Sequence, residues 1–393
     1  MLEELKRTPT TKLYPLMEPC QIHWSACFPI FSVLKIGSVR VRGLDRRGVR
    51  VQAAQGLGSA DYLMPGYWLW SKLIVNLADI GYTESQIGLF CYDWRLDAAN
   101  LERRDRFLTR LRLRIEELVM LSGEKAVVVA HSMGGFNWLY FQGWVTEQDP
   151  TWIGRHVEAV VAAGAHFLGA PATLPAMLSG EQKFSVRGLG TLINSLVDHK
   201  FTFAVARDFV RALGSSGQLL PRGGSAVWGD GSGVVTDAAL SALLVNGEPL
   251  TMENAIAFLN ESMTAPVRAL REGSGELGVK APVQEAGRYG NPLASSFPSV
   301  PDTFRLYCAY GTGLPTPRAA AYLERETQRA PCQWCTQRAE GHWTVNHSYS
   351  EGSFVEGFAE TDGDGTVPLV SLGYMCAEGW RHPDLRAFNP SGA

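Results

Sequence analysis

The sequence predicts an α/β fold with a mainly parallel, doubly wound sheet and an inserted cap or lid region. Three observations support this prediction. Short apolar runs rich in β-branched residues have the length of strands. Segments between them repeat apolar residues at steps of three and four, as amphipathic helices do. Strand and helix signals alternate along the chain, which is the order of a parallel sheet with helices on both faces.

The first half of the predicted core has the periodicity of half-buried elements. Residues 48–53 alternate apolar and polar side chains, as a half-buried strand does. Residues 67–78 have helical spacing after the Pro65-Gly66 turn. Residues 87–92 form a short apolar run suited to a buried parallel strand. Residues 108–118 carry the apolar stripe of an amphipathic helix.

The second half of the predicted core is more apolar. After Gly123, residues 126–130 form a β-branched run of strand length. An apolar helix is expected over 136–145 and a further strand over 157–163. The core resumes with a strand at 304–310. These elements continue the alternation of the first half.

The remaining segments lack this regular order. Residues 172–303 have short periodicity interrupted by Gly-rich stretches, which we interpret as the cap or lid, although part of the core can also lie there. Residues 1–47 show no pattern to which we can assign chemistry. The predicted organisation is therefore an unmatched N-terminal segment at 1–47, a first core part at 48–171, a cap at 172–303 and a second core part at 304–393.

Composition excludes several classes of protein. Hydrophobic residues make up 46% and charged residues 19% of the chain, as in folded globular proteins. The net charge of −3 does not indicate nucleic acid as a partner. Six arginines between Arg103 and Arg114 interleave with acidic residues, which favours a solvated helix face. We find neither a signal peptide nor an apolar run of the ~20 residues that a membrane-spanning helix needs.

A candidate nucleophile follows the strand at 126–130. Ala130-His131-Ser132-Met133-Gly134-Gly135 keeps the pattern G-x-S-x-G, with Ala130 in place of the first glycine. In the α/β-hydrolase fold this strand-to-helix elbow exposes the serine and aims the next N–H, here that of Met133, at the oxyanion of the reaction. We predict Ser132 as the nucleophile and Met133 as an oxyanion donor. His131 is expected to pack beneath the elbow and not to be the general base.

The acid is expected in the loop Thr361-Asp362-Gly363-Asp364-Gly365, because this fold has the order serine, acid, histidine. Two aspartates in a Gly-rich turn can also form an Asx turn or a calcium-like loop. The calcium interpretation is weak, since no D-x-D-x-D-G loop ending in Glu is present.

The general base is the difficulty. Of eight histidines, His382 alone follows the acid loop. It precedes a proline in a polar turn near the end of the chain, which favours a surface residue. We therefore expect that the general base is not in this chain.

Several motifs occur together in one order. They are Gly48-Val49-Arg50-Val51, Ala60-Asp61-Tyr62, Pro65-Gly66-Tyr67, Tyr92-Asp93-Trp94-Arg95-Leu96, His131-Ser132-Met133-Gly134, Phe167-Leu168-Gly169-Ala170-Pro171, Leu220-Pro221-Arg222-Gly223-Gly224 before Trp228-Gly229, Tyr310-Gly311 with Pro315-Thr316, the run from Asp362 to Cys376, and Phe388-Asn389-Pro390-Ser391-Gly392. In these motifs the chain resembles the lecithin:cholesterol and phospholipid:diacylglycerol acyltransferase family, most closely the plant and algal phospholipid:diacylglycerol acyltransferases.

The resemblance implies a lipid acyltransferase. Ser132 would take a fatty acyl group from the sn-2 position of a phospholipid and pass it to diacylglycerol, giving triacylglycerol. The family's catalytic acid falls on Asp364, which leaves Asp362 as a turn residue. The resemblance also implies association with the endoplasmic reticulum membrane, and neither a cofactor nor a metal.

The chain departs from the family at both ends. The family has a strand near its start that contributes a second oxyanion donor, and we find no such strand before residue 48. The family's catalytic histidine lies beyond the segment matched by Asn389-Pro390-Ser391-Gly392. Relatives also carry an N-terminal membrane span. We interpret the chain as a fragment or an incomplete gene model.

Two smaller patterns have structural interpretations. Cys332 and Cys335, followed by His342 and His347, imitate a zinc site, but the six residues between the second cysteine and the first histidine are too few for a finger. A local disulfide or free thiols are favoured there. In Tyr92-Asp93-Trp94-Arg95 we expect Asp93 and Arg95 to pair while Trp94 packs.

Two other functions also fit these residues. A lipase or phospholipase would use the same acyl-enzyme with water as acceptor, because the lid and the exclusion of water choose the acceptor. A catalytically inactive lipid-binding protein would account for the missing histidine.

Overall fold

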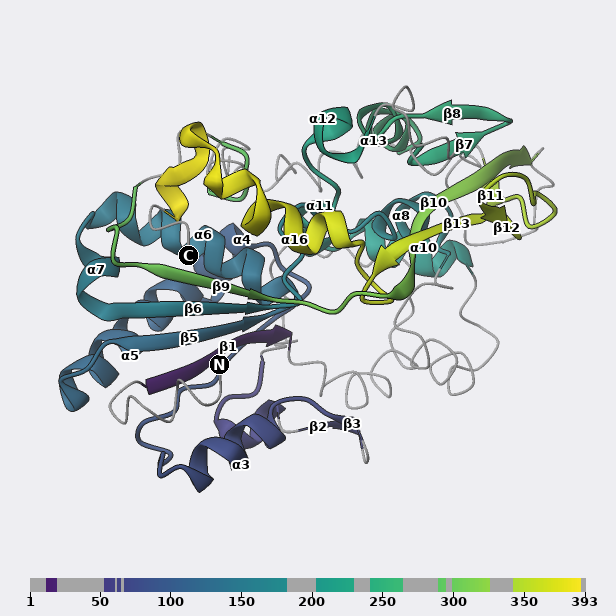
Figure 1. Cartoon of the computed structure of the whole chain (residues 1–393). Coiled ribbons are helices and arrows are strands. Elements are labelled where there is room, and N and C mark those ends of the chain that lie inside the picture. The colour runs from purple at the N-terminus through teal and green to yellow at the C-terminus, as the bar shows by residue number, and fades with distance from the viewer. Residues whose placement is uncertain are drawn as a thin grey trace.

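The computed structural model describes residues 12–19, 53–60, 62–64, 67–181, 203–229, 241–263, 289–294, 299–325 and 342–389. Within these residues the chain is a mixed α/β protein with two larger sheets (Figure 1).

The central sheet is parallel in every pairing. In spatial order its strands are β4 (Phe90–Tyr92), β1 (Lys12–Pro19), β5 (Ala126–His131), β6 (Val157–Ala163) and β9 (Arg305–Ala309). The β-branched centre of β5 is buried, and its Val128 is in register with Val160 of β6. The predicted strands at 126–130, 157–163 and 304–310 are confirmed, and β4 lies within the predicted strand at 87–92. The predicted strand at 48–53 lies almost entirely outside the described residues.

The structure contains one strand that the sequence did not predict. We found no strand before residue 48 of the kind that contributes the family's second oxyanion donor, yet β1 lies between β4 and β5 in the middle of the sheet. The lack of that donor stays a prediction. Its sequence contains Pro15 and Pro19, which have no N–H to donate to a ladder. Because proline argues against a central strand, the sequence pattern concealed this one.

Helices cover both faces of the parallel sheet. Val128 and Ala130 face one hydrophobic core together with apolar residues of α5 (Phe107–Ser122) and α6 (Met133–Gln148). Val127 and Val129 face a second core with Leu77 of α3 (Ser71–Asp79). Helix α7 (Trp152–His156) contributes Trp152 and Ile153 to the same core as α5 and α6. The doubly wound arrangement therefore follows from the alternation of side chains along β5.

The predicted helices at 108–118 and 136–145 lie within α5 and α6, and are confirmed. The helix expected from Tyr67 begins only at Ser71, because Tyr67–Trp68 forms strand β3 against β2 (Tyr62–Met64). The remaining helical elements of this part are η2 (Leu57–Ala60), α4 (Ala98–Asp105), α16 (Leu369–Ala377), η4 (Gly379–Arg381) and η5 (Pro383–Phe388).

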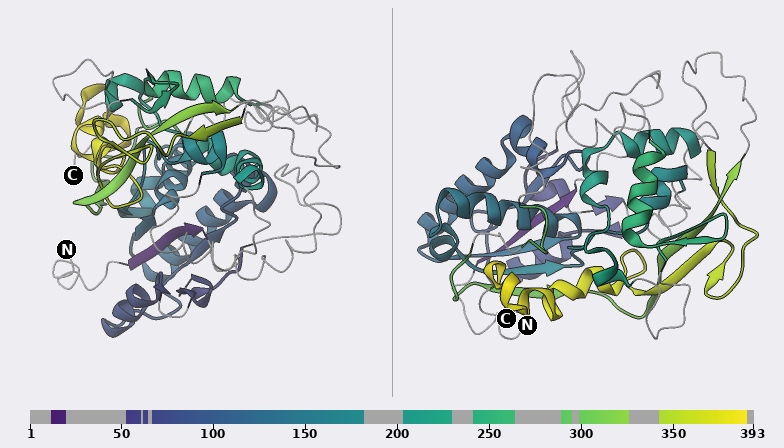
Figure 2. Two further views of the ribbon diagram at one scale, coloured as in Figure 1. Left: turned by 90° about the vertical axis from the view of Figure 1, so that its right-hand side faces the viewer. Right: turned by 90° about the horizontal axis from the view of Figure 1, so that it is seen from above.

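A second sheet lies beyond the carboxyl ends of the parallel strands (Figures 1 and 2). Its strands are β12 (Phe354–Val355), β13 (Phe358–Gly363), β10 (Leu314–Arg325), β7 (Leu243–Val245) and β8 (Glu248–Leu250), with β11 (His342–Val345) paired to β10. Its companion helices are α8 (Thr173–Ser179), α10 (Phe203–Arg211), α11 (Gly214–Gln218), α12 (Gly224–Trp228) and α13 (Met252–Glu261). The sheet takes strands from both sides of residue 304, and the predicted division of the chain into core and cap stays a prediction.

None of the helices in the described ranges combines the length and the apolar character needed to cross a membrane.

A disulfide joins Cys308 of β9 to Cys376 of α16. The two cysteines are 68 residues apart in the chain, so their spacing gives no sign of the pairing. Since α16 begins directly after the acid loop, the bond fixes the helix behind that loop to the edge of the parallel sheet.

Replacing both cysteines, Cys308→Ala with Cys376→Ala, should lower the free energy of unfolding by about 2–4 kcal/mol, because the cross-link restricts the unfolded chain. Urea denaturation followed by circular dichroism measures this loss. A variant with the wild-type midpoint and slope would show that the bond adds no stability.

Candidate active site

Ser132 occupies a strained turn between β5 and α6. Its backbone has φ 53° and ψ −125°, a conformation that costs a non-glycine residue about 1–3 kcal/mol. The turn is held because the N–H of Ser132 donates to the carbonyl oxygen of Ala163 at 2.9 Å. This is the local geometry of a nucleophile elbow, in which the serine stands at the end of a buried strand and immediately before a helix.

The elbow requires small residues on both sides. Ala130 is fully buried in β5. A Cβ added to Gly135 would lie 2.3 Å from Cβ of Ala165, which follows β6 closely in the chain. Glycine at this position therefore lets the first turn of α6 approach the neighbouring strand's exit loop. The departure from the usual pattern, Ala130, fits the space.

Met133 is the first residue of α6. Its N–H has no carbonyl acceptor within the helix, and the helix dipole adds positive potential there. The side chain of Met133 is buried, so only its backbone can serve a reacting group. Its role as an oxyanion donor stays a prediction that this position favours.

Asp364 lies beside the elbow. Its Oδ1 accepts hydrogen bonds from the N–H groups of Thr366 at 2.8 Å and Val367 at 2.7 Å. Its Oδ2 lies 3.9 Å from the place of a Cβ on Gly164, the residue after Ala163. One carboxylate oxygen is thus fixed by the loop, and the other is directed toward the strand ends next to Ser132.

Asp362 has a different position. Its Oδ1 accepts a hydrogen bond from the N–H of Gly313 at 2.5 Å, which ties β13 to the turn before β10. This contact fits a turn residue. The choice of Asp364 over Asp362 as the acid remains a prediction, now with a geometric reason.

His131 packs on the α3 face of the sheet. Its ring meets the ring of Trp70 edge to face, with centroids 6.1 Å apart. Its Nε2 also lies 4.0 Å from the place of a Cβ on Gly164, so it borders the region that Asp364 faces. The contact with Trp70 fits the expected packing beneath the elbow, and that His131 is not the general base stays a prediction.

The sequence did not single out His166, which lies in the loop after β6. The residue is 5% exposed, and neither ring nitrogen has a hydrogen-bond partner in the described part of the chain. Burial, with smaller contributions from the charges of His131 and Arg222, lowers the pKa of His166 to about 4. The imidazole is therefore neutral near pH 7. No sequence signal distinguishes it from an ordinary core histidine.

Arg222 is the second residue whose role the sequence did not reveal, although it lies in one of the matched motifs. Its guanidinium carbon lies 4.8 Å from the ring centroid of Phe136, on the first turns of α6. Burial lowers the pKa of Arg222 to about 10, which leaves it protonated at neutral pH.

His382 lies on the surface. Its side chain is 62% exposed, and its Nδ1 is 3.6 Å from Oδ2 of Asp384. The chain after α16 runs back from the carboxyl edge of the sheet (Figure 1). The expectation of a surface residue is confirmed.

The zinc-like pattern is only partly visible. Cys332 and Cys335 lie outside the described residues. His347 is exposed, with Nδ1 3.2 Å from the carbonyl oxygen of Glu356. The favoured interpretation of these cysteines stays a prediction.

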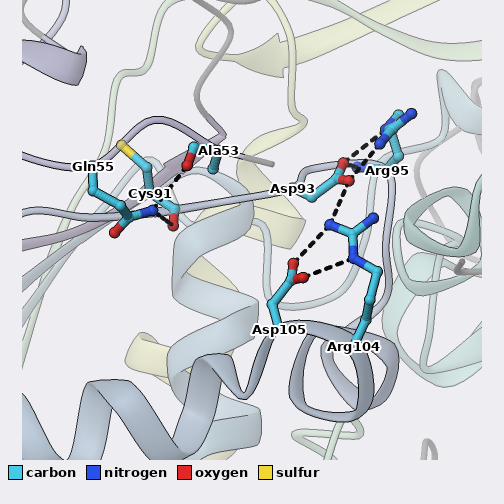
Figure 3. A network of polar contacts seen from close by, with 7 residues as sticks. All are labelled: Ala53, Gln55, Cys91, Asp93, Arg95, Arg104 and Asp105. Carbon is cyan, nitrogen blue, oxygen red and sulfur yellow. Dashed lines mark hydrogen bonds and ion pairs between the residues drawn. The ribbon is translucent and has the colours of Figure 1, made fainter. Parts of the chain in front are cut away.

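Asp93 is the centre of a buried ion-pair network after β4 (Figure 3). Its carboxylate accepts from Nε of Arg95 at 2.8 Å and from Nη2 at 2.6 Å, and Nη2 of Arg104 is 2.8 Å away. Arg104 also bonds both carboxylate oxygens of Asp105. Burial alone would raise the pKa of Asp93, but the two arginines outweigh it and hold the pKa below its ordinary value.

The predicted pairing of Asp93 with Arg95 is confirmed, and Trp94 packs against Phe209 of α10 with ring centroids 6.4 Å apart. Two arginines of α5 are paired with acidic side chains. Arg112 bonds Glu116 and Arg114 bonds Glu117, which fits the expected helix face with interleaved charges.

Comparison with known proteins gives one consistent result. The model of the lecithin:cholesterol acyltransferase family matches residues 31–390. A curated relative from Schizosaccharomyces pombe, named phospholipid:diacylglycerol acyltransferase, is 32% identical over 89% of this chain and 56% of its own length. A relative of the same name from Saccharomyces cerevisiae is 31% identical over 89% of this chain and 54% of its own length. Phospholipid:diacylglycerol acyltransferase 1 of Arabidopsis thaliana is 30% identical over 89% of this chain and 65% of its own length. The chain thus spans somewhat more than half the length of the relatives it matches.

Asp93→Asn should lower the free energy of unfolding by about 3–5 kcal/mol, because it leaves two arginines without their shared carboxylate. The pKa of Asp93 is lowered in the folded state, so its contribution is complete above its ordinary value of 3.8 and is lost as the pH falls below that value. The difference between wild type and variant should therefore narrow in acid. Urea denaturation between pH 7 and pH 3 measures both effects.

Asp105→Asn is the matched control, since Arg104 keeps Asp93 as a partner. It should cost less than Asp93→Asn. Equal losses in the two variants would contradict the central position of Asp93.

Proposed function

We propose that this chain, which belongs to the lecithin:cholesterol acyltransferase family, is a lipid O-acyltransferase that carries the acyl group on Ser132. The observation that supports this most is the elbow itself, where a serine in a strained conformation stands before a helix and next to a carboxylate directed at the strand ends. The names of the relatives favour transfer from a phospholipid to diacylglycerol.

The fold proposed with this function is the α/β-hydrolase fold. The nucleophile follows a strand in the middle of a parallel sheet, and the second sheet stands beyond the carboxyl ends of the strands, where ligands bind in open α/β sheets. A cap over that edge would exclude water from the acyl-enzyme, which is the condition for transfer to an alcohol in place of hydrolysis.

The first half-reaction forms the acyl-enzyme. Oγ of Ser132 attacks the carbonyl carbon of the sn-2 ester while its proton passes to the general base. The negative charge on the former carbonyl oxygen is stabilised by the N–H of Met133 at the start of α6. The carbon–oxygen bond to glycerol then breaks, the base returns the proton to the leaving oxygen, and a lysophospholipid departs.

In the second half-reaction the acyl group passes from Ser132 to diacylglycerol. The hydroxyl of diacylglycerol loses its proton to the base and attacks the acyl carbon, and Ser132 regains its hydroxyl as triacylglycerol leaves. The base in this family is a histidine, which the resemblance puts beyond the segment matched by Asn389-Pro390-Ser391-Gly392. Both half-reactions, and the activity measurements below, are therefore proposed for the longer protein that supplies this histidine. Asp364 would orient it through Oδ2, because Oδ1 already accepts two backbone hydrogen bonds. Since both substrates are lipids, we place the reaction at a membrane surface, and the resemblance favours the endoplasmic reticulum.

Ser132→Ala should reduce formation of labelled triacylglycerol from diacylglycerol and sn-2-labelled phospholipid by about 10³-fold or more, because no acyl-enzyme can form. The variant should unfold at the wild-type midpoint or above it, since alanine removes no buried group. A serine-directed fluorophosphonate should label the wild type and not the variant. Undiminished acyl transfer by the variant would overturn the assignment, and labelled fatty acid as the main product would make the protein a lipase.

Asp364→Asn and Asp362→Asn form a matched pair two residues apart. Asparagine at 364 weakens the orientation of the base and should lower kcat by about 10³–10⁴-fold. Asparagine at 362 can still accept from the N–H of Gly313, so activity should fall by less than tenfold. The reverse order of effects would move the acid to Asp362.

A further inference from the structure

Arg222 is held from several sides. Its backbone N–H donates to the carbonyl oxygen of Leu168 at 2.9 Å, and its own carbonyl oxygen accepts from Nε1 of Trp228 at 2.7 Å. Its Nη1 donates to the carbonyl oxygen of Gln218 at 2.8 Å, while the guanidinium lies over Phe136. The position of this cation is therefore fixed by the fold.

Among the residues that the structure describes, the charge of Arg222 has no carboxylate paired with it. No ion pair to an acidic residue occurs at Arg222 within the described ranges, in contrast to Arg95 and Arg104, which share Asp93. A half-buried cation without a counter-charge costs free energy, and an anionic ligand would offset that cost. Guanidinium binds phosphate well because its planar donors match two oxygens at once.

His166 supplies a second donor from the loop that holds Arg222. The carbonyl oxygen of His166 accepts from the N–H of Gly169 at 3.0 Å, and the N–H of Arg222 donates to Leu168 in the same turn at 2.9 Å. A neutral imidazole has one N–H to donate. Because buried polar groups are nearly always hydrogen-bonded, an imidazole whose two nitrogens have no partner among the described residues indicates a missing partner.

The pair borders the nucleophile. Phe136, beneath the guanidinium, is one helical turn after Ser132 in α6. Ala165, next to His166, faces Gly135 of the same turn. The segment before Arg222 is pinned to the exit loop of β6 by the N–H of Ala170, which donates to the carbonyl oxygen of Leu219 at 2.8 Å.

We propose that Arg222 and His166 form the subsite for the phosphodiester of the acyl donor. The inference rests on the proposed function, because a short glycerol link joins the sn-2 ester to the phosphate and brings both to neighbouring sites. One phosphate oxygen would accept from the guanidinium and another from the imidazole N–H. The subsite then selects a phospholipid over a neutral ester as the donor.

The test compares a phospholipid with 4-nitrophenyl butyrate, a neutral ester, as acyl donor. Arg222→Gln should lower the ratio of kcat/KM for the phospholipid to that for the neutral ester by about 10–100-fold, and Arg222→Lys should recover part of it. Arg112→Gln is the control, because it removes the same charge from a solvated helix face and should leave the ratio within about twofold. An unchanged ratio in a folded Arg222→Gln protein overturns the subsite.

A second measurement separates a lipid headgroup from free phosphate. Glycerophosphocholine should raise the pKa of His166 in the wild type, followed by NMR of the imidazole, and should do so much less in Arg222→Gln. A rise with inorganic phosphate alone, and none with glycerophosphocholine, would overturn recognition of the donor.

The proposed function fails in a different way from the subsite. If fluorophosphonate does not label Ser132, the acyl-enzyme is wrong whatever Arg222 does. If Ser132 is labelled and the donor ratio is unchanged in Arg222→Gln, only the subsite is wrong.

Discussion

The close approach of the first turn of α6 to the exit of β6 is the constraint on which the site depends. Ser132 can adopt its strained backbone because the carbonyl oxygen of Ala163 holds its N–H, and because Gly135 lets Ala165 come near. The same approach sets Gly164 beside Asp364. One tight contact between the start of α6 and the exit of β6 thus places the candidate nucleophile, the start of the helix and the carboxylate of Asp364 near one another.

Arginine side chains near the carboxyl edge of the sheet have two kinds of surroundings. Around Asp93 every cation described has a carboxylate, and the network ties the end of β4 to α4. Such paired charges fix a shape and leave little field for a ligand. The guanidinium of Arg222 contacts the carbonyl oxygen of Gln218 and the ring of Phe136, which hold it in place without neutralising its charge. The charges after β4 are therefore paired, whereas the charge of Arg222 has no acidic partner among the described residues.

Local pattern predicted much of the parallel sheet, because β5 and β6 are buried runs of β-branched residues whose signal needs no partner. The local pattern did not predict β1, because its prolines disfavour a central strand and only the pairing with its neighbours makes it one. Ser132 and Asp364 could be predicted from motifs, because the turn around each residue is formed by its neighbours in the sequence. His166 and Arg222 carry no such signal, since it is only in space that the ring nitrogens of His166 lack hydrogen-bond partners and Arg222 lacks an acidic one among the described residues. The pairing of Cys308 with Cys376 was equally hidden, because it depends on α16 returning to β9.

The place of β1 in the sheet has a consequence for how the protein is made. This strand is synthesised before its two neighbours, because β4 and β5 follow it by some seventy and more than a hundred residues. Its backbone N–H and C=O groups cannot pair until both neighbours are present, and parallel pairings between strands so far apart in the sequence form slowly. During that interval the unpaired edges of the sheet are open to association with other chains. Because the candidate site stands at the end of β5, it can form only after both neighbours of β1 have been synthesised.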